Sequence, residues 1–300
     1  MSALEFGRRR RTGERVVHAL LVSCAAVTVA TTVGIVGVLL HQAVEFFREV
    51  PLGDFATGGV WTPHFADPSY GVLPLVTGSF LVAVIAGMVA LPTGLLSAVF
   101  LSEYAPGRVR AVVKPMLEIL AGIPTVVYGY VALTLVTPAL QVVLPDIRLF
   151  NALSAGLVVG VMILPMVISL SEDALRTVPR GLREAAFGLG ATRFETSMRV
   201  VVPAAASGIA ASFILALARA VGETMVVTIA AGNLANLTLD PFESVQTMTS
   251  FIAQVSLGDT PRGTLIYHSL FAVGLTLFFI TLVMNGVSRW ALGRVRERYR

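Results

Sequence analysis

The sequence has 300 residues, of which 55% are hydrophobic and 13% are charged, and its mean hydropathy is +0.81. Soluble domains carry about 25% charged residues, so this composition excludes an ordinary water-soluble domain and predicts an integral membrane protein. The formal net charge of +4 at pH 7 does not call for a nucleic-acid partner, because the arginines follow the pattern expected of membrane topology.

Six segments are long and apolar enough to cross a bilayer as helices, which takes about 20 mainly apolar residues. The sequence therefore predicts an all-α integral membrane protein with six transmembrane helices. The third segment contains Gly122 and Pro124, and such interruptions are tolerated where neighbouring helices satisfy the backbone, so it is predicted to pack inside a bundle. Trp61, near a predicted membrane edge, is predicted to be an interfacial anchor. In chain order the six segments are 17–44, 72–101, 112–141, 152–171, 206–232 and 264–288.

The positive charges alternate from one side of the predicted membrane to the other. The two terminal tails and two alternate loops contain 18 of the 22 Lys and Arg residues, the other three loops contain 3, and Arg219 lies inside a span. By the positive-inside rule, both termini are expected in the cytoplasm. The predicted organisation is a basic N-terminal tail (1–16), a transmembrane domain (17–288) and a basic C-terminal tail (289–300), with membrane lipids as partners.

The longest predicted cytoplasmic connection covers about 172–205. Its length and mixed polarity predict two short helices broken near Gly188 to Gly190. It contains EAAFGLG (184–190), followed nine residues later by VVVP (200–203). One interpretation is an ordinary surface loop, made basic by its location.

The spacing of this stretch resembles the coupling loop in the membrane subunits of ATP-binding-cassette (ABC) importers. In that family, Ile and Leu-Pro usually occupy the last positions, where this chain has Val200 and Val202-Pro203. The resemblance implies that a short helix docks on a nucleotide-hydrolysing partner and transmits its closure to the transmembrane helices. It also allows Glu103 to brace this region, with a solvated loop as the alternative. The residues implied in ATPase coupling are Glu184, Ala185, Ala186, Gly190 and Pro203.

The chain lacks a nucleotide-binding motif of its own. A phosphate-binding loop requires G-x-x-x-x-G-K-[ST], and the only lysine, Lys114, is preceded by RAVV. We therefore expect a membrane permease subunit rather than an enzyme, with no bound cofactor and with ATP-Mg used by partner subunits. The four histidines have no metal-ligand spacing, so no metal site is expected.

Two opposite charges interrupt the fifth predicted span. The stretch ALARAVGETMVV (216–227) places Arg219 and Glu223 four residues apart, on one face of a continuous helix. Intramembrane charges mark transport pathways or pair with each other, since an arginine at the bilayer centre costs about 2.5–3.5 kcal/mol. Two interpretations remain open at this point: a structural bridge, or a guanidinium that holds two oxygens of a passing anion.

The sequence RAVGETMVV…GN is similar to the fifth span of phosphate importer permeases. The stretches YGVLPLVTGSF (70–80), LPTGLLSAVFLSEYAP (91–106) and ILPMVISLSEDALRTVP (163–179) agree with this resemblance, which covers roughly residues 60–285. The similarity is greater to the PstC type than to the PstA type, which continues GETAP where this chain has GETMVV.

The resemblance to PstC-type permeases implies a type I ABC importer fold and a bacterial plasma (inner) membrane location. It implies a PstA-type second permease subunit, two PstB-type ATP-binding subunits and a PstS-type extracytoplasmic phosphate-binding protein. Arg219 and Glu223 are the expected lining of the phosphate path, and Thr224 could add a hydroxyl contact.

Other functions remain as alternatives. The chain could be a PstA-type subunit or a permease for another oxyanion, such as sulfate or molybdate. An ion-coupled secondary carrier would predict inverted internal repeats and would leave the EAA stretch without a role. A membrane enzyme would require a nucleophile–base or metal constellation within the spans, and none is visible in the sequence.

Overall fold

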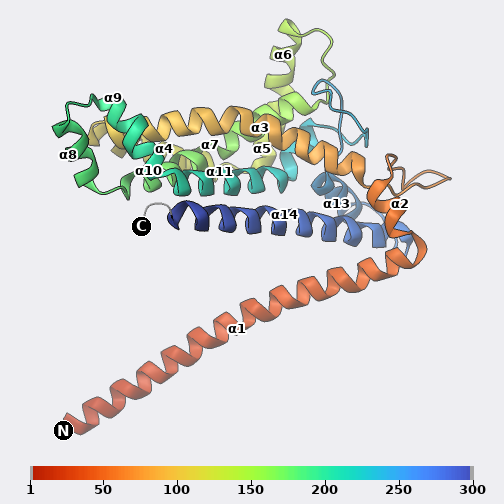
Figure 1. Cartoon of the computed structure of the whole chain (residues 1–300). Coiled ribbons are helices and arrows are strands. Elements are labelled where there is room, and N and C mark those ends of the chain that lie inside the picture. The colour runs from red at the N-terminus through yellow and green to blue at the C-terminus, as the bar shows by residue number, and fades with distance from the viewer. Residues whose placement is uncertain (1–2, 298–300) are drawn as a thin grey trace.

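The structure of this chain, a computed structural model, describes residues 3–297, and every regular element in that range is helical (Figure 1). Side chains are described for residue 14, residues 17–287 and residue 290, so most side chains of the predicted tails lie outside the described residues. With η marking π-helical turns, the elements are α1 (Ala3–Glu49), α2 (Leu52–Thr57), α3 (Leu73–Val99), η1 (Phe100–Tyr104), α4 (Gly107–Gly122), α5 (Thr125–Val131), η2 (Ala132–Val136), α6 (Thr137–Val143), α7 (Ala152–Arg176), α8 (Arg180–Gly188), α9 (Arg193–Thr196), η3 (Ser197–Val201), α10 (Val202–Ala204), α11 (Ala206–Val221), α12 (Met225–Ala230), α13 (Met248–Leu257) and α14 (Leu265–Glu297).

Five helices are long and apolar enough to cross a membrane, and a sixth span is reached if the bent pair Arg193–Ala204 and Ala206–Val221 counts as one. This agrees with the predicted all-α, six-span fold. In Figure 1 the start of α1 and the end of α14 both lie toward the end of the molecule that carries α8 and α9. An even number of crossings places both ends of the chain on the same side of the membrane. That this side is the cytoplasm remains a prediction.

The third predicted span is two helical segments. Because Pro124 disfavours the helical conformation in the residue before it, Ile123 is extended (ψ 130°) and α4 ends at Gly122. No residue of α4 is buried within this chain. The prediction that this segment packs inside the bundle is therefore wrong for α4, whose Met116 and Ile119 side chains are left for lipid or a partner.

The centre of the bundle is the pair of helices α3 and α7, which pack along much of their length. Small residues allow the two backbones to approach, as is usual where helices pack within membranes. Gly156 of α7 is one such position, because a Cβ atom there would stand 2.6 Å from Cβ of Ile85 on α3.

We expect Gly156→Ala to destabilise the fold by about 1–3 kcal/mol, the range for inserting a methyl group into a packed core. The measurement is the thermal unfolding midpoint of the chain in detergent. Gly286→Ala is the matched control, because a Cβ at that position of α14 meets nothing within 4 Å. A midpoint for Gly156→Ala at or above that of the control would contradict the prediction.

An aromatic cluster closes the end of the bundle opposite α8. The connection between α2 and α3 folds back on itself, with an isolated β-bridge between Trp61 and Tyr70. Trp61 packs edge-on against Phe251 of α13, with ring centroids 4.9 Å apart, and only 3% of its surface is exposed. The prediction of an interfacial anchor at Trp61 is therefore wrong, because tertiary packing takes the indole into the core.

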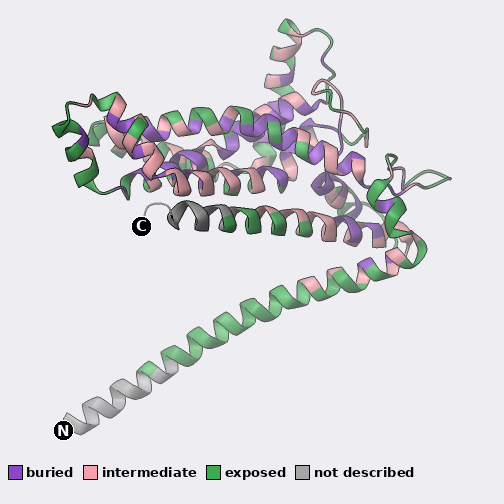
Figure 2. Ribbon diagram, in the orientation of Figure 1, coloured by how far each residue is buried: buried purple, intermediate pink, exposed green. Residues whose placement is uncertain are grey.

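Helix α1 extends away from the bundle and is exposed along most of its length (Figure 2). None of the residues in its most apolar stretch is buried within this chain. Its last turns pack on α14, where Phe46 joins Ala272 and Val273 in the core. An apolar helix of this kind requires lipid or another subunit to cover it.

Candidate transport and coupling sites

The predicted fifth span is broken where the two charges lie. Helix α11 ends at Val221 and α12 begins at Met225, so Arg219 and Glu223 do not share one continuous helix. The prediction that four-residue spacing places them on one face is wrong, because helical periodicity stops between them.

The Glu223 side chain accounts for this break. It is 8% exposed, and its Oε1 accepts hydrogen bonds from the backbone N–H groups of Met225 (3.1 Å) and Val226 (3.2 Å). These are among the N–H groups that a helix leaves without partners in its first turn, and a carboxylate there is favourable. The buried Glu223 carboxylate therefore stabilises the N-terminus of α12.

A second contact holds the break from the other side. Thr249 of α13 is 5% exposed, and its Oγ1 donates a 2.6 Å hydrogen bond to the backbone carbonyl of Glu223. The start of α13 is in turn fixed to α3, because the N–H of Met248 donates to Oγ of Ser79 at 3.0 Å. The break is therefore tied to the central helices of the bundle.

Arg219 has a different environment. It lies in the last turn of α11, where a cation complements the helix dipole, and it is exposed on this chain. Among the residues that the structure describes, no acid lies within 4 Å of its guanidinium, so the Arg219–Glu223 bridge is not formed. Thr224, the half-buried residue after Glu223, donates a long 3.4 Å hydrogen bond to the carbonyl of Gly222, so its hydroxyl is weakly held.

The predicted coupling loop forms two short helices, as expected. α8 ends at Gly188 and α9 begins at Arg193, and between them Gly190 adopts φ +85°, a conformation that favours glycine. Glu184 and Ala185 are exposed, whereas Ala186 is buried against the bundle. Pro203 lies in the short α10, just before the 70° bend that leads into α11.

The outer surface of this loop is unusually apolar. Leu182, Phe187, Leu189 and Phe194 are between 45% and 91% exposed. Exposed large hydrophobic residues in one region are characteristic of a protein–protein contact. This surface, with Glu184 and Ala185 beside it, has the chemistry expected of a docking surface.

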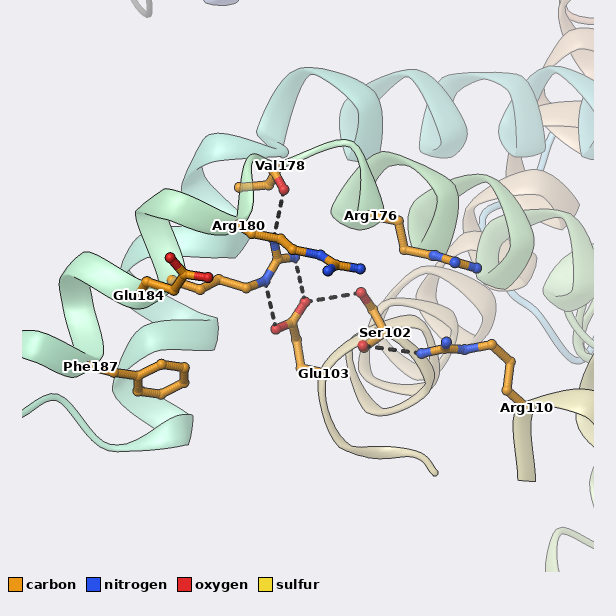
Figure 3. A pocket seen from close by; sticks show the side chains of 9 residues that line it. Ser102, Glu103, Arg110, Arg176, Val178, Arg180, Glu184 and Phe187 are labelled. Atoms are coloured by element: carbon orange, nitrogen blue, oxygen red, sulfur yellow. Dashed lines mark hydrogen bonds and ion pairs between the residues drawn. The ribbon is translucent and has the colours of Figure 1, made fainter. Parts of the chain in front are cut away.

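One arginine attaches α8 to the bundle (Figure 3). The guanidinium of Arg183 donates to both carboxylate oxygens of Glu103, at 2.8 and 3.1 Å, and also to the carbonyls of Val178 (2.7 Å) and Leu175 (2.9 Å). Glu103 lies in η1, the π-helical end of α3. Of the two interpretations of Glu103, bracing of the loop therefore matches the structure, and a solvated loop does not.

A buried carboxylate lies nearby, at the end of α7. The Glu172 side chain is 0% exposed and is surrounded by Lys114 (2.5 Å), Arg110 (3.4 Å) and Arg176 (3.5 Å). Removing a carboxylate from water is costly unless cations compensate it, as they do here. Among the described residues, no group of three or more His, Cys, Asp or Glu is placed to hold a metal ion.

The chain also matches a known family. Residues 90–298 match the profile described as the inner membrane component of binding-protein-dependent transport systems. The chain belongs to this family. It is therefore a membrane permease subunit of the ABC importer class, and the match includes both the predicted coupling loop and the break at residues 222–224.

Individual permeases of the same class are similar over most of their length. A probable ABC transporter permease, YqgH of Bacillus subtilis, is 34% identical over 92% of this chain and 89% of its own. The phosphate transport system permease PstC of Mesorhizobium japonicum is 34% identical over 81% of this chain and 79% of its own. A probable PstC of Methanocaldococcus jannaschii is 32% identical over 77% of this chain and 78% of its own. These relatives confirm the resemblance to PstC-type permeases.

Solved ABC importers share the fold. A chain of the inward-facing MetNI methionine transporter aligns with a TM-score of 0.56 and 18% identity, covering 75% of this permease and 94% of that chain. A chain of a bacterial alginate transporter aligns with a TM-score of 0.63 and 14% identity, covering 90% of this permease and 92% of that chain. The type I importer permease fold is thereby confirmed.

Three contacts at these candidate sites were not predicted from the sequence. Thr249 lies 26 positions after Glu223, and Lys114 lies on a different helix from Glu172. Neither contact can be recognised from neighbouring residues in the sequence. Arg183 lies one residue before the EAA stretch, which could have marked it as a candidate for attaching the loop.

Proposed function

We propose that this permease is a pore-forming subunit of an ATP-driven importer of inorganic phosphate. The observation that carries the proposal is an exposed guanidinium, Arg219, with no acidic partner among the residues that the structure describes. It lies beside a helix break in a chain whose relatives include PstC phosphate permeases. A free guanidinium fork can hold two oxygens of a phosphate, which a paired one cannot do without breaking its bridge.

The two charges have separate tasks in this proposal. Arg219 contacts the passing oxyanion, and Glu223 holds the break by its bonds to Met225 and Val226. Irregular backbone at membrane depth is tolerated where it lines a cavity or is buried in protein. Thr224 contributes a hydroxyl on the same turn. Phosphate then moves past Arg219 as the pore alternates between outward and inward openings.

The proposed partners follow from the surfaces described above. A PstA-type second permease subunit would complete the pore and, with lipid, cover α1. PstB-type subunits would bind the apolar surface of α8 and α9, with Glu184, Ala185, Ala186, Gly190 and Pro203 transmitting ATP-driven closure. A PstS-type protein would deliver phosphate to the opposite end. We place the complex in a bacterial plasma membrane with both termini cytoplasmic.

The test is ATP-dependent uptake of radiolabelled phosphate or sulfate into vesicles that contain the assembled complex. We expect phosphate uptake that excess sulfate does not reduce. Sulfate uptake equal to phosphate uptake would contradict the assignment of phosphate as the specific substrate and would favour another oxyanion. Uptake driven by an ion gradient without ATP would favour a secondary carrier.

Glu223→Gln separates the two tasks. Because a glutamine Oε1 can accept the same two backbone hydrogen bonds, we expect assembly and thermal stability to change little. Phosphate uptake should also remain within about fivefold of wild type, since the net contribution of one hydrogen bond is about 1 kcal/mol or less when it is replaced in kind. Loss of uptake in a stable, assembled Glu223→Gln complex would mean that the carboxylate charge itself acts in transport.

A further inference from the structure

A cavity of about 440 Å³ lies behind α8, between this helix and the bundle. It is lined by four guanidinium groups and two carboxylates, so its lining has an excess of positive charge. Figure 3 shows that the side chains reach the cavity from different elements. The charged residues that line it are Glu103, Arg110, Arg176, Arg180, Arg183 and Glu184.

Two of the four arginines are used by the fold. Arg183 donates four hydrogen bonds, two of them to Glu103. Arg110 donates to the carbonyls of Leu101 and Ser102, and its Nε lies 3.4 Å from the buried Glu172 carboxylate. These contacts fix the position of their guanidinium groups at the cavity wall. They also neutralise Glu103, so this carboxylate does not satisfy the other cations.

The other two arginines retain free donors. Arg176 has one long contact, 3.5 Å to Glu172, and its side chain is 53% exposed. Arg180 is exposed, and it forms no hydrogen bond or ion pair within the part of the chain that the structure describes. In Figure 3 the Arg180 side chain extends toward Ser102 and Arg110 approaches Ser102 from the opposite side, while the Arg176 guanidinium lies beyond Ser102 and points away from it.

We propose that this cavity binds a phosphate group. Guanidinium groups from three elements, Arg110 of α4, Arg176 of α7 and Arg180 of α8, surround it, which suits a tetrahedral anion better than a planar carboxylate with two oxygens. The cavity volume of about 440 Å³ is large enough for a phosphate group and some of its hydration.

The bound group would act on the position of α8. Arg176 belongs to the bundle and Arg180 to α8, so an anion between them ties the helix to the bundle at a point separate from the Glu103–Arg183 contact. Separating α8 from the bundle would then require release of the ligand. The site does not depend on which solute crosses the membrane, and its ligand is either free phosphate or an anionic lipid headgroup.

Hydrogen exchange of the α8 amides tests the site in the full chain. The probes are inorganic phosphate added to nanodiscs of phosphatidylcholine, with sodium chloride of equal ionic strength as the reference, and nanodiscs containing phosphatidylglycerol without added phosphate. With ligand at ten times its Kd, exchange that requires α8 to open should slow about tenfold, because opening releases the ligand. Slowing by phosphate identifies a free anion as the source, and slowing by phosphatidylglycerol alone identifies a headgroup.

The variants locate the effect. Arg176→Gln/Arg180→Gln should abolish the slowing, whereas Arg193→Gln, an exposed arginine of α9 outside the cavity, should retain it. Arg219→Gln should also retain it, which separates this site from the proposed phosphate path. No slowing with either probe, equal slowing by chloride, or slowing that persists in the double variant would overturn the proposal. The wild-type result alone is sufficient to overturn it if the double variant fails to fold.

Discussion

Arg219→Gln should abolish most phosphate uptake while the complex still assembles. The side chain is exposed at the end of α11 and has no acidic partner among the described residues, so its removal leaves no buried charge and opens no cavity. Hydrogen bonds to charged groups contribute about 1.5–3 kcal/mol, so losing the contact to phosphate should reduce uptake about 10- to 150-fold. Arg219→Lys should recover only part of this, because an ammonium cannot bind two oxygens in a fork.

Uptake of radiolabelled phosphate and ATP hydrolysis, measured in the same vesicles, test this prediction. Arg262→Gln is the control, since it removes an equally exposed arginine from the loop before α14. Retained ATP hydrolysis with lost uptake would support a guanidinium on the phosphate path. Normal uptake in Arg219→Gln would leave this arginine with only its favourable interaction with the α11 dipole.

Arg183→Met should separate ATP hydrolysis from transport. The change removes four hydrogen bonds and leaves Glu103, whose side chain is 12% exposed, without its cation. Breaking a fully buried pair by removing one partner costs about 3–5 kcal/mol, and this partly buried pair should cost less than that. We expect α8 to lose its fixed position, so that hydrolysis continues but far less phosphate is moved for each ATP.

A graded series of variants makes the prediction specific. Arg183→Lys should be intermediate, because one ammonium cannot satisfy two carboxylate oxygens and two carbonyls. Glu103→Gln should be the mildest, since both carbonyl contacts of Arg183 remain. Arg262→Lys, at an exposed position in the loop before α14 and away from α8 and α9, is the control. A ratio of uptake to hydrolysis that is equal across the series would contradict the proposed bracing.

Much of the fold could be predicted from the sequence, because the signals are local. Runs of apolar residues gave the all-α membrane class, and the EAAFGLG stretch indicated the break between α8 and α9, where Gly190 has positive φ. The family followed from the same motif and from the surroundings of Arg219. Each of these inferences depends on neighbours within a few turns of one helix.

The errors have a common physical origin in contacts between distant segments. The Glu223 side chain binds the first N–H groups of α12, and Thr249 of α13 donates to the Glu223 carbonyl, so residue spacing alone could not reveal the break. Trp61 is buried by Phe251, which lies 190 positions later in the chain. Periodicity gives the face of a helix, but which partner covers that face depends on tertiary packing.

The pairing of α1 with α14 bears on the order in which the protein is made. The first helix leaves the ribosome long before α14 exists, because α14 is the last element that the structure describes. Within the described residues, α14 is the helix against which α1 packs most extensively. Contacts between segments so far apart in sequence form late, since the intervening chain must first be arranged. Until α14 is inserted, α1 lies in the bilayer without this packing partner. During that time it can bind a neighbouring subunit whose synthesis is already complete. The timing of translation could thus decide whether α1 binds another subunit before it packs on α14.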